Sequence, residues 1–329
     1  MKKKLLSIVL PLAACIGLSG QARALDKVLF GMPMPSGKTM PLIMAKESGM
    51  FEKQGLDVEL KYFNSGTMAT TALVAESVAI SCSGGTDAIQ AMLGGADIVI
   101  VGGIFNYVDG HLVSAKTITR PEQLKGKAVG ISAFGANSEF QARTALKRLG
   151  LGPSDVTLLQ VGAPAQRLAA LESGNVQATI IEPPLNLMAR KTGMNTLLDL
   201  LDLRIPAEMI VIATTKANLQ KNPQMVEKVL RGVVSGIHYM RTHKQETLAV
   251  MKKSMKIDDM DALEETYNQV LIKGVPEKPY AQVEGVQVLL TWLAEKNPAA
   301  RSADPSKMVD STIIKRLDGS GFIDALYKK

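Results

Sequence analysis

From residue 25 onward, the sequence alternates short apolar runs, rich in β-branched residues, with amphipathic helical segments. The strand-like runs are residues 27–30, 57–62, 78–81 and 98–104 in a first stretch, and residues 128–132, 156–161, 178–181 and 208–214 in a second. Strands separated by segments of helical periodicity are typical of wound α/β units with largely parallel sheets. The alternation therefore predicts two α/β lobes.

The chain changes character near residue 218, after which it is almost wholly helical. The helical runs are residues 223–242, 244–255, 259–272, 280–295 and 305–317. Such a tail cannot supply a third sheet, so we expect it to cover the first lobe. The prediction is a first lobe from residues 25–112 and 213–329, a second lobe from residues 113–212, and a hinge of two strand-like crossings near residues 104–113 and 209–215.

The first 24 residues have the pattern of a secretory signal peptide. Three lysines precede an apolar run at residues 5–18, and Ala22-Arg23-Ala24 provides a small-residue cleavage site. The apolar run is too short to span a bilayer comfortably, so we expect export to the periplasm. Leu12-Ala13-Ala14-Cys15 also resembles a lipoprotein cleavage box, which leaves lipid attachment at Cys15 as the alternative to cleavage after Ala24.

Removal of this leader changes both the charge and the cysteine count. The formal charge of the whole chain is +7, and the leader carries four of the positive charges and no acid, so +3 remains. Nucleic acid is therefore not a predicted partner. Cys82 becomes the last thiol, so an intramolecular disulfide is excluded and packing is expected to stabilise the protein.

The segment Ser36-Gly37-Lys38-Thr39 ends like a phosphate-binding P-loop but does not have its spacing. Five residues separate Gly31 from Gly37, where the motif needs four. The loop also contains Pro33 and Pro35, which have no N–H to donate to a phosphate. The sequence does not predict a nucleotide site here.

No other pattern indicates catalysis. The three histidines, His111, His238 and His243, lie in different segments without zinc-ligand spacing, and there is no Cys-x-x-Cys or Gly-x-Ser-x-Gly. We therefore predict no catalytic residue, no metal and no cofactor. His111 is the histidine that lies near the expected cleft.

Five turns share one form, in which a strand is followed by small residues and hydroxyls or amides where a helix begins. They are residues 35–39, 64–67, 83–87, 134–138 and 182–184. In a parallel α/β sheet these turns lie at the carboxyl ends of the strands, where ligands bind. Free N–H groups and helix dipoles there favour negative charge. One such turn is explained by helix capping alone; five of them predict a ligand cleft.

The candidate ligand-binding residues are Ser36, Lys38, Thr39, Ser65, Gly66, Thr67, Gly85, Thr86, Phe134, Asn137, Ser138 and Glu182. Lys38 is the nearby cation able to pair with an anionic ligand, or else a solvated loop lysine. Glu182 binds an amine or hydroxyl, or else orients its own loop. Phe134 is a candidate for an apolar wall.

Several segments resemble one known family. They are residues 41–59 (PLIMAKESGMFEKQGLDVE), 64–67 (NSGT), 84–87 (GGTD), 124–130 (LKGKAVG), 167–178 (RLAALESGNVQA) and 182–183 (EP). The sequence resembles type II periplasmic binding proteins of the alkanesulfonate, taurine and thiamine-precursor group, the NMT1/THI5-like group. The likeness covers nearly all of the chain after the leader.

This resemblance implies a two-lobed fold with a two-strand hinge, ligand contacts from the five turns, and delivery to an ABC permease. The predicted function is a solute-binding receptor, expected to be monomeric, that captures a small sulfonate- or carboxylate-like anion by hinge closure. Relatives bind sulfonates, carboxylates, nitrate, amino-acid-like molecules and pyrimidines, so the ligand stays open. Arg167 stands where the family commonly has Arg, as a ligand contact or a helix-surface residue. The alternatives are an enzyme on the same fold, acting on a small heterocycle or carboxylate through Lys38, His111 or Glu182, and a ligand-sensing receptor for a signalling partner.

Overall fold

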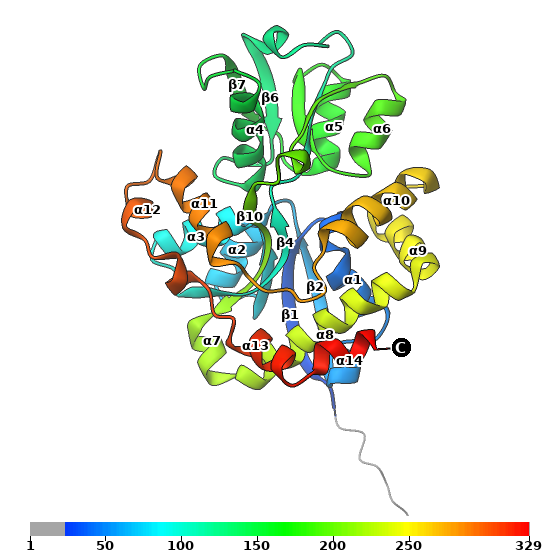
Figure 1. The fold of residues 1–329 in the computed structure, drawn as a ribbon, viewed down its shortest axis with the longest axis vertical. Helices are drawn as coiled ribbons and strands as arrows, with labels where there is room; N and C mark the ends of the chain where they lie inside the picture. Colours follow the sequence, from blue (N-terminus) through cyan, green and yellow to red (C-terminus); the bar gives the residue numbers. More distant parts are fainter. Residues whose placement is uncertain (1–23, 329) are drawn as a thin grey trace, which may run out of the picture.

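The structure is a computed structural model that describes residues 24–328, and it consists of two α/β lobes joined by extended crossings (Figure 1). The predicted signal peptide, with Cys15, lies outside the described residues apart from Ala24. Between residues 24 and 328, no helix is both long and apolar enough to cross a membrane.

The first lobe is built on a five-stranded sheet in the order β2-β1-β3-β10-β4. Its elements before the first crossing are β1 (Asp26–Pro33), α1 (Met40–Glu47), β2 (Leu56–Phe63), α2 (Gly66–Val74), β3 (Ile80–Ser83), α3 (Gly85–Leu93) and β4 (Ile98–Tyr107). β1 pairs in parallel with β2 and β3, as expected from the strand–helix alternation, whereas β10 is antiparallel to both of its neighbours. The carboxyl ends of β1, β2 and β3 therefore meet at one edge, and the helices α1, α2 and α3 follow from that edge.

The second lobe repeats this plan with the strand order β7-β6-β8-β5-β9. Its elements are β5 (His111–Ser114), β6 (Lys127–Ile131), α4 (Asn137–Arg148), β7 (Val156–Gln160), α5 (Pro164–Glu172), β8 (Ala178–Ile181), α6 (Leu185–Lys191) and β9 (Asn195–Asp199). β6 is parallel to β7 and β8, and β5 is the antiparallel strand. The sequence did not predict α6 or β9, both of which are short.

The strand β10 (Pro206–Thr215) lies in a different sheet from the one expected. The sequence assigned residues 208–214 to the second lobe and placed a crossing at residues 209–215, but β10 pairs with β3 and β4 of the first lobe, with Val211 opposite Ser83 and Gly103. The chain returns across residues 200–205, and the expected lobe end at residue 212 falls inside β10. That assignment was wrong because an apolar run predicts a strand but not its partner.

After β10 the chain is helical, as predicted. The helices are α7 (Lys216–Lys221), α8 (Pro223–Thr242), α9 (Lys244–Met255), α10 (Met260–Thr266), a π-helix at Tyr267–Ile272, α11 (Val283–Leu293), α12 (Ala299–Ser302), α13 (Thr312–Gly319) and α14 (Phe322–Tyr327). α8 packs closely on α1. The contact requires glycine at position 236, since a Cβ atom there would lie only 2.6 Å from the Cβ atom of Ala45. α10 and α11 lie on opposite sides of the lobe junction (Figure 1).

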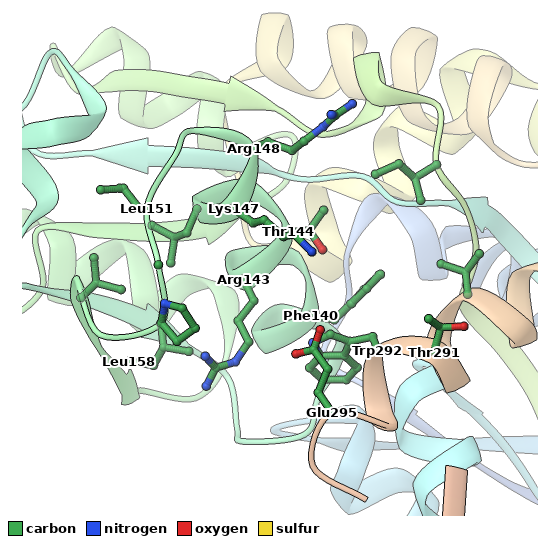
Figure 2. A pocket seen from close by; sticks show the side chains of 16 residues that line it. Phe140, Arg143, Thr144, Lys147, Arg148, Leu151, Leu158, Thr291, Trp292 and Glu295 are labelled. Atoms are coloured by element: carbon green, nitrogen blue, oxygen red, sulfur yellow. The ribbon is translucent and has the colours of Figure 1, made fainter. Parts of the chain in front are cut away.

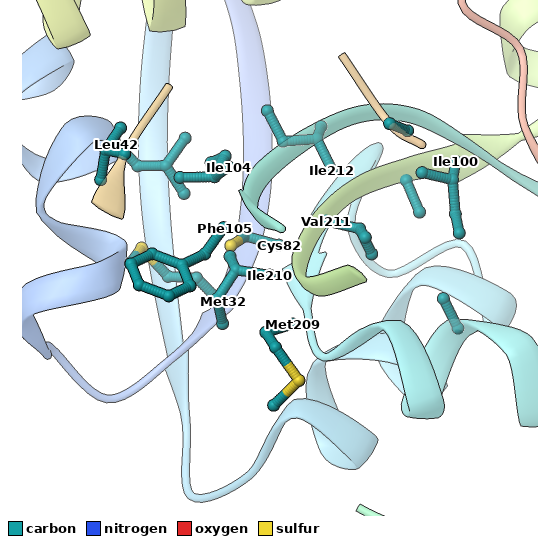
Figure 3. Packing of buried hydrophobic residues seen from close by; sticks show 14 of the residues in the cluster. Met32, Leu42, Cys82, Ile100, Ile104, Phe105, Met209, Ile210, Val211 and Ile212 are labelled. Atoms are coloured by element: carbon teal, nitrogen blue, oxygen red, sulfur yellow. The ribbon is translucent and has the colours of Figure 1, made fainter. Parts of the chain in front are cut away.

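Buried hydrophobic side chains pack against the sheet of the first lobe (Figure 3). Met32, Phe105 and Ile212 pack around Cys82, whose side chain is fully buried. Burial raises the pKa of the Cys82 thiol to about 12. The last thiol of the chain after the leader is therefore an inert part of the core.

Candidate ligand-binding site

A cavity of about 100 Å³ lies between the two lobes, at the edge where the strands end. It is lined by Pro33, Met34, Ser36, Lys38, Asn64, Ser65, Gly66, Gly84, Asp87, Ser132, Ala136, Asn137, Ser138, Gln141, Pro164, Arg167, Glu182 and Ile210. We call it the central cavity. The first turns or N-caps of α2, α3, α4 and α5 all contribute to its wall. The structure therefore brings turns from both lobes to one place, as the strand–turn–helix pattern predicted.

The sequence-predicted residues divide into two groups. Ser36, Lys38, Ser65, Gly66, Asn137, Ser138 and Glu182 line the central cavity, whereas Thr39, Thr67, Gly85, Thr86 and Phe134 do not. Thr39 and Thr86, from the second group, form hydrogen bonds with Ser36 and Asn137 of the first group.

Lys38 lies at the centre of an ion cluster that joins the lobes. Its Nζ atom donates to Asp109 Oδ1 at 3.0 Å and to Glu182 Oε1 at 3.2 Å. The ammonium also lies 5.8 Å from the centre of the Phe105 ring. Lys38 is 6% exposed, so it is neither a solvated loop lysine nor a cation free to meet a ligand.

Burial and pairing act in opposite directions on these three groups. Burial alone would lower the pKa of the Lys38 ammonium, but Asp109 and Glu182 outweigh it and the pKa is raised. Burial raises the pKa of Asp109 despite the nearby lysine. At Glu182 the effect of burial is outweighed by Lys38 and Arg167, and the pKa is lowered. Lys38 is therefore charged at neutral pH.

Asp87 organises the turns before α2 and α3. Its carboxylate accepts the Thr67 hydroxyl at 2.7 Å and the Gly84 N–H at 3.1 Å. A side chain at Gly66 would collide with this carboxylate, so the close approach requires glycine. Burial raises the pKa of Asp87 to about 6. Thr67 therefore holds Asp87 in place and does not face the cavity.

Asn137 connects the lobes from the start of α4. Its Oδ1 atom accepts the Thr86 hydroxyl at 2.8 Å, and its Nδ2 atom donates to the carbonyl of Met209 on β10. Nearby, Gln90 Nε2 donates to the Gly135 carbonyl at 2.5 Å. The amide expected to bind ligand thus makes its hydrogen bonds to the opposite lobe.

The hydroxyl groups in two of the turns are engaged locally. Ser138 Oγ accepts the Ser132 N–H at 2.8 Å, and the two serine hydroxyls are 2.7 Å apart. Thr39 Oγ1 accepts the Ser36 N–H at 3.0 Å and donates to the Ser36 carbonyl at 3.1 Å. Thr39 is fully buried and closes its own turn.

Two candidate residues, Phe134 and Gly85, lie outside the lining of the central cavity. Phe134 is 56% exposed and does not form an apolar wall of the central cavity. Gly85 packs on β10, where a side chain would collide with the carbonyl of Glu208. Close packing of α3 on β10 therefore explains why a glycine stands at position 85.

Arg167 lies in the wall of the central cavity and is 3% exposed. Its Nε atom donates to the Ile180 carbonyl at 3.0 Å and its Nη1 atom to the Gly162 carbonyl at 2.8 Å. The Nη2 atom makes no hydrogen bond to any residue in the range 24–328. Arg167 is therefore a buried cation with a donor left over, and not a helix-surface residue.

Sequence reasoning missed Asp109 and Gln141, and it placed His111 near the cleft. Asp109 precedes a glycine between two strands, and this local pattern predicts a turn. It does not indicate that Asp109 pairs with Lys38, which is distant in the sequence. Gln141 Nε2 donates to the Asp109 carbonyl at 2.7 Å. His111 instead pairs with Asp199 at 3.2 Å and lines a separate cavity of about 600 Å³ near the hinge.

The ionisable side chains around the central cavity carry one more acid than base. Two cations, Lys38 and Arg167, stand among three acids, Asp87, Asp109 and Glu182. Four helix N-termini add partial positive charge to this set. The side chains offer no excess positive charge, so an anion in this site would depend on the helix starts and on the Arg167 guanidinium.

Comparison with known proteins finds a family match and many structural neighbours. The model of the family described as NMT1/THI5 like matches residues 36–247. A Bacillus subtilis (strain 168) protein named for the binding of aliphatic sulfonates is 26% identical over 337 residues, covering 96% of this chain and 97% of the relative.

Three solved structures show the same fold. A protein from Bordetella bronchiseptica RB50 has a TM-score of 0.80 at 22% identity, covering 90% of this chain and 98% of that one. The periplasmic aliphatic sulphonate binding protein SsuA from Escherichia coli has a TM-score of 0.70 at 20% identity, covering 88% and 99%. The desulfurization enzyme DSZB has a TM-score of 0.66 at 16% identity, covering 90% and 99%. The predicted two-lobed binding-protein fold is confirmed, and that fold also carries an enzyme.

Proposed function

This chain belongs to the NMT1/THI5-like family, and from that premise we propose that it is the periplasmic solute-binding receptor of an ABC importer. Its solute is a small organic monoanion, carboxylate- or sulfonate-like, held in the central cavity. The relative from Bacillus subtilis, named for aliphatic sulfonates, supports this class of ligand. Permease subunits are the proposed partners.

One observation carries the proposal, the convergence of four helix N-termini from both lobes on one cavity with a buried arginine. Backbone N–H groups at helix starts, with the helix dipole behind them, bind anionic groups. Arg167 Nη2 adds a charged donor. From the sequence, Lys38 was the cation expected to pair with an anionic ligand. Because Lys38 is already paired with two carboxylates, we assign the pairing with the anion to Arg167.

The acids limit the charge that a ligand can bring. A dianion would meet Asp87, Asp109 and Glu182 within one buried site, and like charges at short range are costly in a low dielectric. A monoanion adds the least negative charge to this acid-rich set, and a hydrogen-bond donor on the ligand would pair with Glu182. The cavity volume of about 100 Å³ also favours a small solute.

The contacts between the lobes support a mechanism in which the lobes close around the solute. Thr86–Asn137 and Lys38–Glu182 join opposite lobes directly, so they must break when the lobes separate. The solute docks first on one lobe, and the other lobe then completes its contacts. Binding shifts the population to the closed form, in the manner of hinged receptors.

A thermal-shift screen tests the ligand class. Small monoanionic sulfonates and carboxylates are compared with their neutral amides, and a true ligand raises the melting temperature in proportion to RT ln(1 + [L]/Kd). Arg167→Gln is expected to reduce that shift more for the anion than for the amide, whereas Arg120→Gln, an exposed arginine that lines neither cavity between the lobes, leaves it unchanged. Equal effects of Arg167→Gln on anion and amide would contradict the assignment.

Recovery of the ligand separates the receptor from the enzyme alternative. The Lys38 ammonium has a raised pKa and the Cys82 thiol a pKa of about 12, so neither is a ready nucleophile at neutral pH. A ligand recovered unchanged supports the receptor, whereas a converted product refutes it. X-ray scattering with and without ligand tests closure, which predicts compaction at saturation.

A further inference from the structure

A third cavity, of about 550 Å³, lies at the side of the lobe junction between α4 and α11 (Figure 2). We call it the α4–α11 pocket. It is lined by Phe140, Arg143, Thr144, Leu146, Lys147, Arg148, Leu151, Gly152, Pro153, Val156, Leu158, Ile205, Val288, Thr291, Trp292 and Glu295. None of these residues lines the central cavity.

The two sides of this pocket come from different lobes and touch at one end. Phe140 on α4 and Trp292 on α11 have ring centroids 5.2 Å apart, tilted by 58°, and Figure 2 shows them side by side with Glu295. Lys296 Nζ lies 2.6 Å from Glu139 Oε1 across the same junction. The pocket is therefore defined in the closed arrangement of the lobes.

The interior is apolar while the rim is positive. Leu151 and Leu158, from the lobe II side, belong to the mostly apolar wall (Figure 2). Lys147 and Arg148, at the end of α4, are exposed, and their side chains form no hydrogen bond or ion pair with the described part of the chain. Glu295 is the acid among the lining residues. An apolar cavity of a few hundred Å³ with a few placed polar groups is the usual form of a small-molecule site.

We propose that the α4–α11 pocket binds an amphipathic monoanion, a carboxylate with a medium-length apolar chain, at a site separate from the solute of the central cavity. The chain lies along the leucines and the aromatic pair, and the carboxylate lies at the rim beside Lys147 and Arg148. Because the walls belong to both lobes, this ligand stabilises the closed arrangement. The proposal does not depend on the identity of the central solute.

The first experiment titrates the protein with octanoate and, in parallel, with neutral 1-octanol. Trp292 is the one tryptophan of the chain, so its emission reports directly on the pocket wall, and calorimetry gives the affinity. We expect saturable octanoate binding that is about fivefold tighter than that of 1-octanol, the effect of two exposed cations. Equal affinity, or no saturation, overturns the proposal.

Two neighbouring leucines on β7 provide a matched pair of variants. Leu158 lines the pocket, while Leu159 is 40% exposed and does not. Leu158→Asp is expected to abolish octanoate binding and Leu159→Asp to leave it unchanged. Lys147→Glu with Arg148→Glu, both on the surface, is expected to weaken octanoate at least tenfold and 1-octanol hardly at all. This double variant keeps the test valid if Leu158→Asp fails to fold.

The Arg167→Gln variant locates the bound octanoate. Unchanged octanoate affinity in Arg167→Gln, together with loss in Leu158→Asp, supports the α4–α11 pocket. Loss in Arg167→Gln with retention in Leu158→Asp places octanoate in the central cavity and overturns the proposal. Either result is obtained without the central solute, so it is independent of the receptor proposal.

Discussion

The central cavity and the α4–α11 pocket lie at the same lobe junction but differ in their chemistry. The first is small, about 100 Å³, and its polar groups bond to one another, as Lys38 does to Glu182 and Asn137 to Thr86. The second is about 550 Å³, and the cations at its rim, Lys147 and Arg148, have no partner among residues 24–328.

The difference shows that the larger of two cavities is not necessarily the one with more polar and charged side chains in its wall. Polar groups from two lobes satisfy each other on closure, because a buried donor or acceptor without a partner is costly. Apolar side chains form no hydrogen bonds and need not meet at a fixed distance and angle, so the walls of the α4–α11 pocket can stay apart. The predictions that follow test whether the two regions differ in energy as they do in chemistry.

The largest expected effect is at Lys38. Lys38→Met leaves Asp109 and Glu182 buried without their cation, and we expect the free energy of unfolding to fall by about 3 kcal/mol at pH 7. Lys147→Met, in the α4–α11 pocket, is expected to change it by less than about 0.5 kcal/mol. Urea denaturation measures both. Similar losses for the two variants would remove the distinction between the regions.

The next effect tests the strand that lies beneath the central cavity. Glu208 on β10 is fully buried; its Oε1 atom accepts the Gln282 N–H at 2.7 Å, while Oε2 has no partner among residues 24–328, and burial raises its pKa to about 8. From the ordinary carboxyl pKa up to about 8, the folded state keeps a proton that the unfolded chain releases. The free energy of unfolding should therefore decrease by about 2 kcal/mol between pH 6 and 8 on account of this group.

Glu208→Gln should remove this pH dependence, because the amide keeps the shape of the carboxyl group without titrating. Denaturation of both proteins at a series of pH values isolates the contribution, since other titrating groups are common to the two. Parallel curves for the variant and the original chain would show that Glu208 is not protonated in the folded state.

A smaller effect separates two threonine hydroxyls. The Thr86 hydroxyl is buried and bonded to Asn137 across the cleft, whereas the half-buried Thr144 hydroxyl in the α4–α11 pocket has no partner among the described residues. Thr86→Val should lower the free energy of unfolding by about 1 kcal/mol and Thr144→Val should be close to neutral. Thermal denaturation measures both, and the reverse order would contradict the difference between the sites.

The smallest effect concerns the ion pair beside the α4–α11 pocket. Lys296 is largely exposed, and Glu139 retains Arg143 when Lys296 is replaced. Lys296→Ala should therefore cost about 0.5 kcal/mol at low salt and less at 0.5 M salt. A loss as large as that of Lys38→Met would mean that exposed contacts hold the lobes together as firmly as buried ones.

Local chemistry made part of the site predictable. Ser65 and Asn137 stand in strand–turn–helix segments whose composition is enough to place them at the edge of the sheets that faces the central cavity. Phe134 lies in the same kind of turn, yet its side chain is 56% exposed, because turn chemistry places a backbone but does not say where a side chain points. Thr86 and Asp109 support the site through partners that no local pattern reveals.

The sequence by itself determined the alternation of strands and helices, the turns at the carboxyl ends of the strands and the family resemblance, because periodicity and turn chemistry act over a few neighbouring residues. The tertiary structure alone decided that β10 joins the first sheet and that Lys38 pairs with Asp109 and Glu182, which lie 71 and 144 residues away in the chain. Strand partners and buried ion pairs depend on which distant segments become neighbours. Burial then fixes their charge states, since it acts on a group only after the chain has enclosed it.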